Sequence, residues 1–445
     1  MTTLIKDAIL VNEGEIFKGS LLINGKYISS IIRDSEAIPE ADKIIDAEGL
    51  ILMPGLIDDQ VHFREPGNTH KGNIESESAA AILGGVTSFM DMPNTNPPAT
   101  TLSLLEDKYT IASDSSYANY SFYLGGTNDN LSEIEQADYS KICGLKLFLG
   151  SSTGNMLVDN QKALEEIFAK SKILISIHSE DEAVIKSNMK RAVEMYGEEI
   201  PFNLHPLIRS REACIESTTK AIQLAIKHNT SLHILHISTK EEIEMIKNAQ
   251  KINPKITGEV CVHYMVMDDS MYCDYGSRMK CNPAIKTRAD REAIIAAVKE
   301  GVINIVATDH APHTIDEKNH YYSSAPSGLP LIQHSFQIMW ELHLKGYFTI
   351  NDIADRMSHS PARLFKIDRR GFIREGFFAD IMIFDPNKPS EVGKENIKYK
   401  CAWSPFEGSI FNSTIIHTFV NGAHAVSNGK LTGLKAGERL IFKYE

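Results

Sequence analysis

The sequence lacks the features that direct a chain into or across a membrane. No apolar run reaches the roughly 20 residues of a transmembrane helix. The opening stretch, MTTLIKDAILVNEGEIF, has neither the basic start nor the long apolar core of a signal peptide. We therefore expect a protein that does not associate with membranes.

Positive charge and paired cysteines are also scarce. The chain carries 46 Lys and Arg against 58 Asp and Glu, a net charge of −12, and no basic block offsets this balance. A nucleic-acid-binding surface is therefore not expected. The six cysteines are scattered without a Cys-x-x-Cys pair, which is typical of reduced, buried thiols in a cytoplasmic protein.

The two ends of the chain share a strand-like pattern that the middle does not have. Residues 3–32 alternate apolar and polar side chains, and their NGK stretch is typical of a turn. Residues 371–386 and 409–431 show similar strand character. At 445 residues the chain is long enough for two domains. We predict a small composite β-sandwich domain formed by residues 1–53 and 369–445.

The middle of the chain alternates short apolar, β-branched runs with helix-like segments. The runs cover residues 55–63, 85–92, 118–124, 144–150, 172–180, 231–239, 255–262 and 303–310. The helix-like segments include residues 74–85, 161–171, 214–228, 239–250 and 287–300. Eight strands alternating with helices predict an α/β protein with a (β/α)8 barrel over residues 54–368. An open doubly wound sheet is the structural alternative, but no GxGxxG follows the first run, so a dinucleotide fold has little support.

Five polar side chains lie in these runs or at their ends, where a barrel would bring them to one mouth. They are His62, Lys146, His178, His236 and Asp309. A single histidine at a strand end is more often a hydrogen-bonded residue than a ligand. The combination of imidazoles, a carboxylate and a lysine from five strands is instead a ligand set suited to Zn²⁺ or a similar divalent ion.

Two residues allow more than one interpretation. His233 lies three positions before His236, so strand alternation places it on the opposite face, and we expect a structural role. Lys146 beside cations is unfavourable as an ammonium ion. As a neutral amine it can react with CO2 to form an anionic carbamate that bridges two metals. The residues alone favour a lysine whose aliphatic carbons pack against apolar neighbours and whose ammonium group reaches water.

The ordered motifs resemble the cyclic amidohydrolases and, among them, the dihydroorotases most closely. The resemblance extends over nearly the whole chain. The motifs that carry it are PGLIDDQVHFREPG, MDMPNTNPP, GLKLFLG, IHSEDE, LHISTKE, CNPAIKT and ATDHAPHT, with SPARLFKI, REGFFADIMIFDP and NGAHAVSNGKL near the C-terminus.

The resemblance implies a metal centre with one or two zinc ions at the barrel mouth. The metal ligands carried over residue by residue are His62, Lys146, His178, His236 and Asp309. Lys146 matches the lysine that several amidohydrolases carry as a carbamate. Since the stretch LKLFLGSSTGN offers no acidic residue to replace it, we expect a carboxylated Lys146.

The resemblance also implies a set of substrate contacts. Arg64, Asn94 and His313 would hold a substrate carboxylate, for which a guanidinium group is suited. Asn282 would bond the ring amide, and His62 would also lie against the substrate. The stretch SAPSGLP places Ser327 and Gly328 against the ring, although the family usually has a bulkier residue at Ser327.

Gln60 departs from the family pattern, which has His-x-His at positions 60 and 62. A glutamine amide oxygen is a weaker, neutral ligand. Gln60 would then either coordinate weakly, leave its position to water, or restrict tight binding to one ion held by Lys146, His178 and His236. We expect catalysis to survive, because every other matched metal ligand and the carboxylate contacts are present.

The function implied is that of a dihydroorotase, which interconverts N-carbamoyl-L-aspartate and L-dihydroorotate in pyrimidine biosynthesis. A metal-activated hydroxide would attack the ring amide, with Asp309 as acid and base. The alternatives are another cyclic amidohydrolase, of the dihydropyrimidinase or allantoinase type, and a catalytically silent scaffold for aspartate transcarbamoylase. We also expect a homodimer, a possible association with aspartate transcarbamoylase, and a lid formed by residues 313–330.

Overall fold

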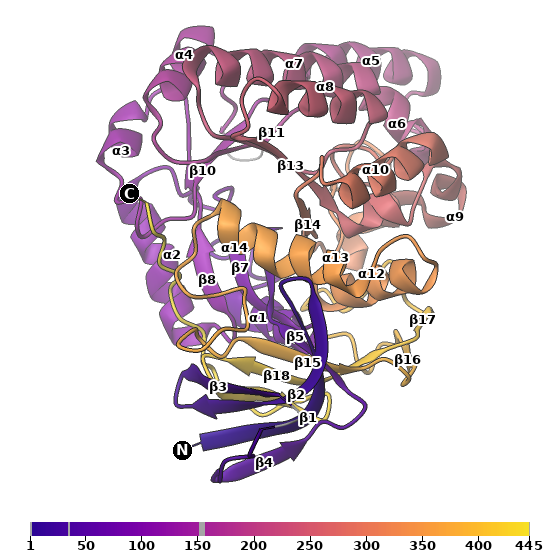
Figure 1. Cartoon of the computed structure of the whole chain (residues 1–445). Coiled ribbons are helices and arrows are strands. Elements are labelled where there is room, and N and C mark those ends of the chain that lie inside the picture. The colour runs from indigo at the N-terminus through magenta and orange to yellow at the C-terminus, as the bar shows by residue number, and fades with distance from the viewer. Residues whose placement is uncertain (1, 34–35, 151–155, 445) are drawn as a thin grey trace.

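The computed structural model describes residues 2–33, 36–150 and 156–444 (Figure 1). The middle of the chain forms a ring of strands and helices, and the strands of both chain ends lie together beside it (Figure 1). None of the helices in these three ranges combines the length and hydrophobicity needed to cross a bilayer.

The eight predicted barrel runs all form parallel strands. They are β6 (Leu56–Val61), β7 (Val86–Asp91), β8 (Asn119–Phe122) with β9 (Leu124–Gly125), β10 (Leu145–Phe148), β11 (Ile175–His178), β12 (Leu232–Ile234), β13 (Ile256–Cys261) and β14 (Ile305–Ala307). β8 and β9 occupy one position in the ring, because β8 pairs with β7 and β9 pairs with β10.

The ring closes where its first and last strands meet. Val61 forms a parallel bridge with His310, and the His62 backbone N–H donates to the His310 carbonyl at 2.7 Å. The predicted (β/α)8 barrel is therefore confirmed, and the open doubly wound sheet is excluded. Closure also brings the carboxyl ends of β6 and β14 side by side, which positions the residues that follow them.

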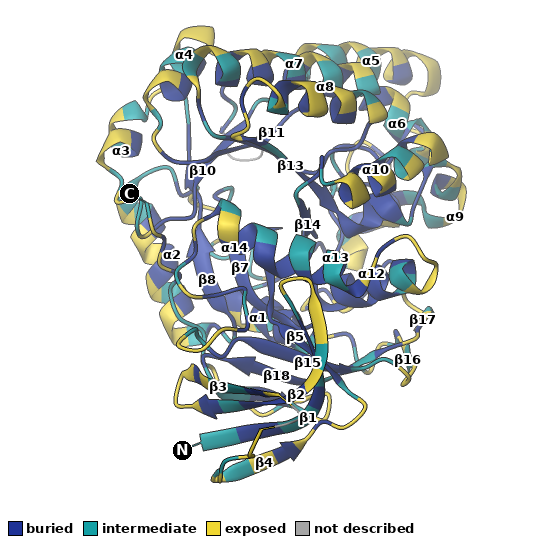
Figure 2. Ribbon diagram, viewed as in Figure 1, coloured by how far each residue is buried: buried dark blue, intermediate teal, exposed yellow. Residues whose placement is uncertain are grey.

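Helices follow the strands, and the long ones cover the outside of the ring, while α6 and α11 lie in segments at the mouth. The helices are α1 (Ile74–Leu83), α2 (Leu102–Ser115), α3 (Leu131–Gln136), α4 (Gln161–Lys170), α5 (Glu182–Tyr196), α6 (His205–Ile208), α7 (Arg211–His228), α8 (Lys240–Gln250), α9 (Tyr272–Tyr275), α10 (Arg288–Glu300), α11 (Ile315–Lys318), α12 (Ser335–Leu344), α13 (Ile350–Ala354) and α14 (Ser360–Leu364). Figure 2 shows exposed residues on their outer faces and buried residues along the barrel strands.

Capping explains why the predicted helix boundaries are close to the observed ones. The Thr287 side chain accepts from the Asp290 backbone N–H, and the Asp290 carboxylate accepts from the Thr287 backbone N–H. This reciprocal pair satisfies two donors that a helix start leaves unpaired. Gly301 ends α10 in the left-handed conformation, with φ +83°.

The strands of the two chain ends form one nine-stranded sheet. Its strands are β1 (Thr2–Asn12), β2 (Glu15–Asn24), β3 (Tyr27–Arg33), β4 (Lys43–Asp46), β5 (Ile51–Pro54), β15 (Ile381–Asp385), β18 (Thr414–Val420), β19 (Ala423–Ser427) and β20 (Lys430–Leu431). Glu13 and Gly14 connect β1 to β2 as a two-residue turn with positive φ at both positions, 51° and 84°.

The two chain ends join where β5 pairs antiparallel with β15. A β-rich domain built from both termini is thereby confirmed, while its limits at residues 53 and 369 stay a prediction. A separate pair, β16 (Ser390–Glu391) and β17 (Ile410–Phe411), lies outside the main sheet. The last residues return to the barrel, because Tyr120 on β8 exchanges backbone hydrogen bonds with Glu438 and Leu440.

A buried polar network fastens the barrel to the sheet. Arg370 forms an ion pair with Asp380, and the two side chains are 4% and 2% exposed. The Asp380 carboxylate also accepts from the Asn119 side chain on β8 at 3.0 Å and from the Asn421 backbone at 2.7 Å. Because Asn119 belongs to a barrel strand while Arg370, Asp380 and Asn421 belong to the C-terminal part of the chain, the network joins the two domains.

Asp380→Ala should therefore destabilise the whole protein. Removing the carboxylate leaves the Arg370 guanidinium buried without its partner, which costs about 3–5 kcal/mol. Guanidinium unfolding followed by circular dichroism measures the loss. The matched control is Asp46→Ala, an exposed acid of the same sheet, for which we expect a change below about 1 kcal/mol. Equal effects from the two substitutions would contradict this account of the domain contact.

Candidate functional site

A cavity of about 580 Å³ opens at the carboxyl ends of the barrel strands. Every residue that the sequence predicts for the site lines it: Gln60, His62, Arg64, Asn94, Lys146, His178, His236, Asn282, Asp309, His313, Ser327 and Gly328. Their individual roles stay predictions, but their convergence on one cavity is a property of the fold.

The candidate metal ligands lie within contact distance of one another in two pairs. His178 Nδ1 is 3.0 Å from His236 Nε2, and His62 Nε2 is 3.1 Å from Asp309 Oδ1. His236 and Asp309 both follow a strand with a positive φ, 40° and 49°. This uncommon backbone conformation for non-glycine residues is found at functional sites.

The electrostatics of these side chains suit a divalent cation. Burial lowers the pKa of His178 and holds the pKa of His236 well below its usual value, so both rings are neutral, as metal ligands must be. Burial, the largest single influence, would raise the pKa of Asp309, but the hydrogen bond from protonated His62 and the charges of the neighbouring histidines together outweigh it, and the pKa falls to about 2. His236 Nδ1 is buried without a partner in the described part of the chain. The donor set therefore fits a zinc-like ion.

Asn94 sets the tautomer of His62. His62 Nδ1 lies 2.8 Å from Asn94 Oδ1, which can only accept, so Nδ1 carries the proton. His62 Nε2 then faces Asp309: in the protonated ring it donates to the carboxylate, and in the neutral ring it presents a lone pair. An outer partner that orients an imidazole in this way is a common feature of metal sites.

Lys146 is buried in the same cluster, with its Nζ over the Phe148 ring, 4.9 Å from the centroid. Its side chain is 1% exposed, and no carboxylate within residues 2–33, 36–150 and 156–444 forms an ion pair with it. Burial lowers the pKa of the Lys146 amine to about 7, against the opposing influence of Asp309 and Glu259. Near neutral pH a large fraction is therefore the neutral amine, the form that reacts with CO2.

Gln60 faces Asp309 as a hydrogen-bond donor. Its Nε2 donates to Asp309 Oδ1 at 3.2 Å, and its Oε1 is 4.0 Å from Cys261 Sγ. The amide oxygen is therefore turned away from Asp309. Gln60 orients the carboxylate in this arrangement, where the family pattern would place an imidazole ligand.

The candidate carboxylate contacts gather on the other side of His62. Arg64 Nη2 is 2.9 Å from His313 Nε2, and Arg64 Nε donates to the Pro312 carbonyl at 3.0 Å. Burial, reinforced by the Arg64 charge, holds the pKa of His313 well below its usual value. Arg64 is thus a fixed cation in the cavity wall, next to a neutral imidazole.

Asn282, Ser327 and Gly328 lie on the side of the cavity formed by the long loop after β14. Asn282 Oδ1 is buried and has no partner among the described residues, which leaves it available to a substrate N–H. The Ser327 carbonyl is 3.1 Å from His313 Nε2. The loop residue Ser327 therefore adjoins His313, and the two line the same side of the cavity.

Two buried lysines, which the sequence reading missed, anchor this loop. Lys280 Nζ donates to the carbonyls of Tyr322 and Ala325, both at 2.6 Å. Lys318 Nζ donates to the carbonyls of Lys280, Pro326 and Gly328 at 3.1, 2.9 and 3.0 Å. Lys318 itself belongs to this segment, so a lid movement would have to break three of these five bonds: the two from Lys280 and the one from Lys318 to the Lys280 carbonyl. A lysine in a loop gives no sequence signal that it will bond backbone carbonyls.

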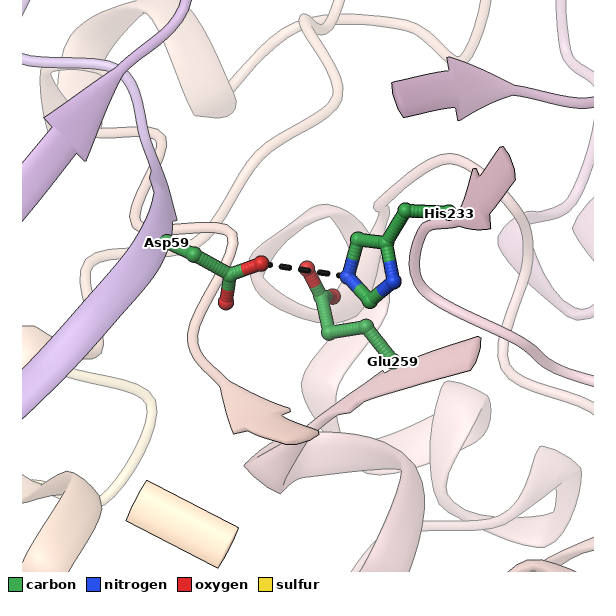
Figure 3. A group of neighbouring side chains, drawn as sticks. All are labelled: Asp59, His233 and Glu259. Atoms are coloured by element: carbon green, nitrogen blue, oxygen red, sulfur yellow. Dashed lines mark hydrogen bonds and ion pairs between the residues drawn. The ribbon is translucent and has the colours of Figure 1, made fainter. Parts of the chain in front are cut away.

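A second polar group, formed by Asp59, His233 and Glu259, lies inside the barrel (Figure 3). All three side chains are fully buried, and His233 Nε2 is 3.1 Å from Asp59 Oδ2. The placement of His233 by strand alternation is wrong. β12 ends at Ile234, so the alternation does not continue to His236, and His233 points into the barrel.

Comparison with known proteins agrees with this geometry. The model of the amidohydrolase family matches residues 51–425. The dihydroorotase of Enterococcus faecalis is 31% identical over 434 residues, covering 96% of this chain and 99% of the relative. The dihydroorotase of Pyrococcus horikoshii is 32% identical, covering 90% of this chain and 87% of the relative.

Solved structures show the same fold. The crystal structure of dihydropyrimidinase from Brevibacillus agri is 26% identical, with a TM-score of 0.91 and complete coverage of both chains. L-hydantoinase from Arthrobacter aurescens has a TM-score of 0.93 at 24% identity, covering 99% of each chain. The protein is thus a metal-dependent cyclic amide hydrolase, and its chain belongs to the amidohydrolase family.

Proposed function

We propose that this enzyme is a dihydroorotase, which interconverts N-carbamoyl-L-aspartate and L-dihydroorotate. The observation that carries the proposal is the fixed Arg64 cation beside His313 in the cavity wall. Dihydroorotate differs from the uncharged rings of dihydropyrimidinase substrates by a carboxylate on the ring. A guanidinium group recognises such a carboxylate through two parallel hydrogen bonds.

The candidate metal ligands support the chemistry of this reaction. His62, Lys146, His178, His236 and Asp309 would hold one or two zinc ions, which when bound activate water and polarise the ring carbonyl. Asp309 is ionised and lies 3.1 Å from His62 Nε2. In hydrolysis, its carboxylate takes a proton from the attacking water and delivers it to the leaving ring nitrogen as the C–N bond breaks.

The remaining contacts orient the ring. Asn94 and His313 would complete the carboxylate site with Arg64. Asn282 would accept from a ring N–H, and the backbone of Ser327 and Gly328 would lie against the ring face. In this arrangement the carboxylate is held on the Arg64 side of His62, which directs the scissile amide toward Asp309.

Dihydropyrimidinase activity is the second candidate, supported by the Brevibacillus agri structure at 26% identity. The silent scaffold is a third, whose support is Gln60. Homodimer formation, association with aspartate transcarbamoylase and a cytoplasmic location stay predictions. Turnover of N-carbamoyl-L-aspartate and of dihydrouracil by the zinc-loaded wild type separates the three candidate functions.

Arg64→Met should lower kcat/KM for dihydroorotate by about 100-fold or more, because bonds to a charged group are worth about 1.5–3 kcal/mol each. Steady-state kinetics with dihydroorotate and dihydrouracil measure the effect. Arg288→Met, at an exposed arginine of α10, is the control and should behave as wild type. Wild-type turnover of dihydrouracil that equals dihydroorotate turnover would identify a dihydropyrimidinase. A zinc-loaded wild type that turns over neither compound would identify a scaffold.

Asp309→Asn should lower turnover by about 10²–10⁴-fold, the usual contribution of general acid–base catalysis. Dihydroorotate binding should stay detectable by calorimetry, because the carboxylate contacts are intact. Asp316→Asn, an exposed acid of α11, serves as the control. Zinc content is measured on the same samples, so that a lost proton carrier is distinguished from a lost ligand. Full activity of Asp309→Asn would remove Asp309 from the reaction.

We further propose that Lys146 is carboxylated and bridges the metal site. Lys146→Ala should then lose both bound zinc and turnover. A small carboxylic acid such as propionate should restore part of both, because its carboxylate places two anionic oxygens where the Lys146 carbamate would lie. Zinc analysis and kinetics with and without propionate test this. An Lys146→Ala variant that retains its zinc and its activity would contradict the bridging role.

A further inference from the structure

The buried group of Asp59, His233 and Glu259 joins three separate strands of the barrel. Asp59 lies on β6, His233 on β12 and Glu259 on β13. One ligand atom from each lies within 4.8 Å of the other two. Figure 3 shows the side chains pointing toward one another from these strands.

The proton positions around His233 leave a lone pair directed at a carboxylate. The Thr257 hydroxyl donates to the Leu232 carbonyl at 3.2 Å, so its oxygen accepts from His233 Nδ1 at 2.8 Å. In the neutral ring Nε2 is then unprotonated, yet it lies 3.1 Å from Asp59 Oδ2. Two acceptors at this distance need a positive charge between them, which is either a second proton or a metal ion.

One added proton cannot neutralise this group, because Glu259 contributes a second carboxylate. Glu259 Oε1 is 3.1 Å from the His236 backbone N–H and 3.3 Å from Cys261 Sγ, and both can donate to it. Among the described residues, Glu259 Oε2 and Asp59 Oδ1 have no hydrogen-bond partner. No Lys or Arg in the described ranges forms an ion pair with either acid. An imidazolium would therefore still leave one negative charge uncompensated, at a high cost for a fully buried site.

Apolar side chains surround the group, so bulk water cannot solvate the charge of its carboxylates. The His233 ring lies edge-on to Phe365, with centroids 6.0 Å apart. Phe365 belongs to an apolar cluster that includes Ile57, Leu174 and Ile305. Carboxylates in such an environment are normally protonated, paired or bound to a metal.

We propose that Asp59, His233 and Glu259 bind a divalent cation inside the barrel, separate from the ions predicted at its mouth. One imidazole nitrogen and two carboxylate oxygens neutralise the charge of the ion and are a set that Zn²⁺ or Mn²⁺ accepts. Thr257 orients the His233 ring, as an outer partner does in metal sites. Because Glu259 also holds the His236 backbone, the ion would stabilise the position of a candidate ligand at the mouth.

Anomalous diffraction and metal analysis test this proposal without any activity measurement. Crystals of the full-length wild type grown with zinc, and separately with manganese(II), should show a peak within about 2.3 Å of all three side chains. Zinc per chain, measured by mass spectrometry on zinc-loaded protein, should fall by one ion in His233→Gln. It should equal the wild-type value in His228→Gln, a histidine at the end of α7.

Asp59→Asn is the second variant in case His233→Gln does not fold, since it keeps the shape of the side chain and removes its charge. It should also lose one ion. The proposal is overturned if wild-type crystals show peaks at the mouth but none at the interior group with either metal. It is equally overturned if Asp59→Asn retains the wild-type zinc content, because the group is then neutralised by protons. Neither result depends on whether the enzyme is a dihydroorotase.

Discussion

Closure of the barrel between β6 and β14 is the constraint on which the candidate site depends. The bond from the His62 backbone N–H to the His310 carbonyl, 2.7 Å long, joins the first strand to the last. It brings His62 next to Asp309, although the two are far apart in sequence. A buried pair between His310 Nε2 and Glu77, at 2.8 Å, anchors the same point to α1. An open sheet would leave these residues at opposite edges.

A closed barrel also gathers acidic side chains. Asp58, Asp59, Glu259 and Asp309 lie on barrel strands or just after one. Burial raises the pKa of Asp58 to about 8 and that of Glu259 well above its usual value, which shows the cost of negative charge there. Lys146, whose pKa burial lowers to about 7, offsets this charge only in part. If it becomes a carbamate it adds to the negative charge instead of offsetting it. A barrel with this interior has a physical reason to bind cations at more than one level, which links the proposed interior ion to the metal chemistry at the mouth.

Gln60 shows how one substitution can be accommodated in such a site. As a donor to Asp309 it holds the carboxylate by a hydrogen bond, where an imidazole would hold it through a shared ion. The neighbouring contacts of His62 with Asn94 and of Arg64 with His313 involve no atom of Gln60. The candidate carboxylate contacts therefore do not require an imidazole at this position.

The order of strands and helices, and the set of residues at the strand ends, can be predicted from the amino-acid sequence alone. The spacing of apolar residues and the helix caps are local properties, so Thr287 and Asp290 start α10 wherever the helix packs. The residues that face the barrel interior depend instead on long-range contacts. His233 points inward, where it meets Asp59 and Glu259 across the ring, and His236 still lines the mouth because the alternation stops where β12 ends at Ile234. Lys280 and Lys318 bond backbone carbonyls distant in sequence. These contacts depend on the ends of strands and on the return of loops, which no local pattern encodes.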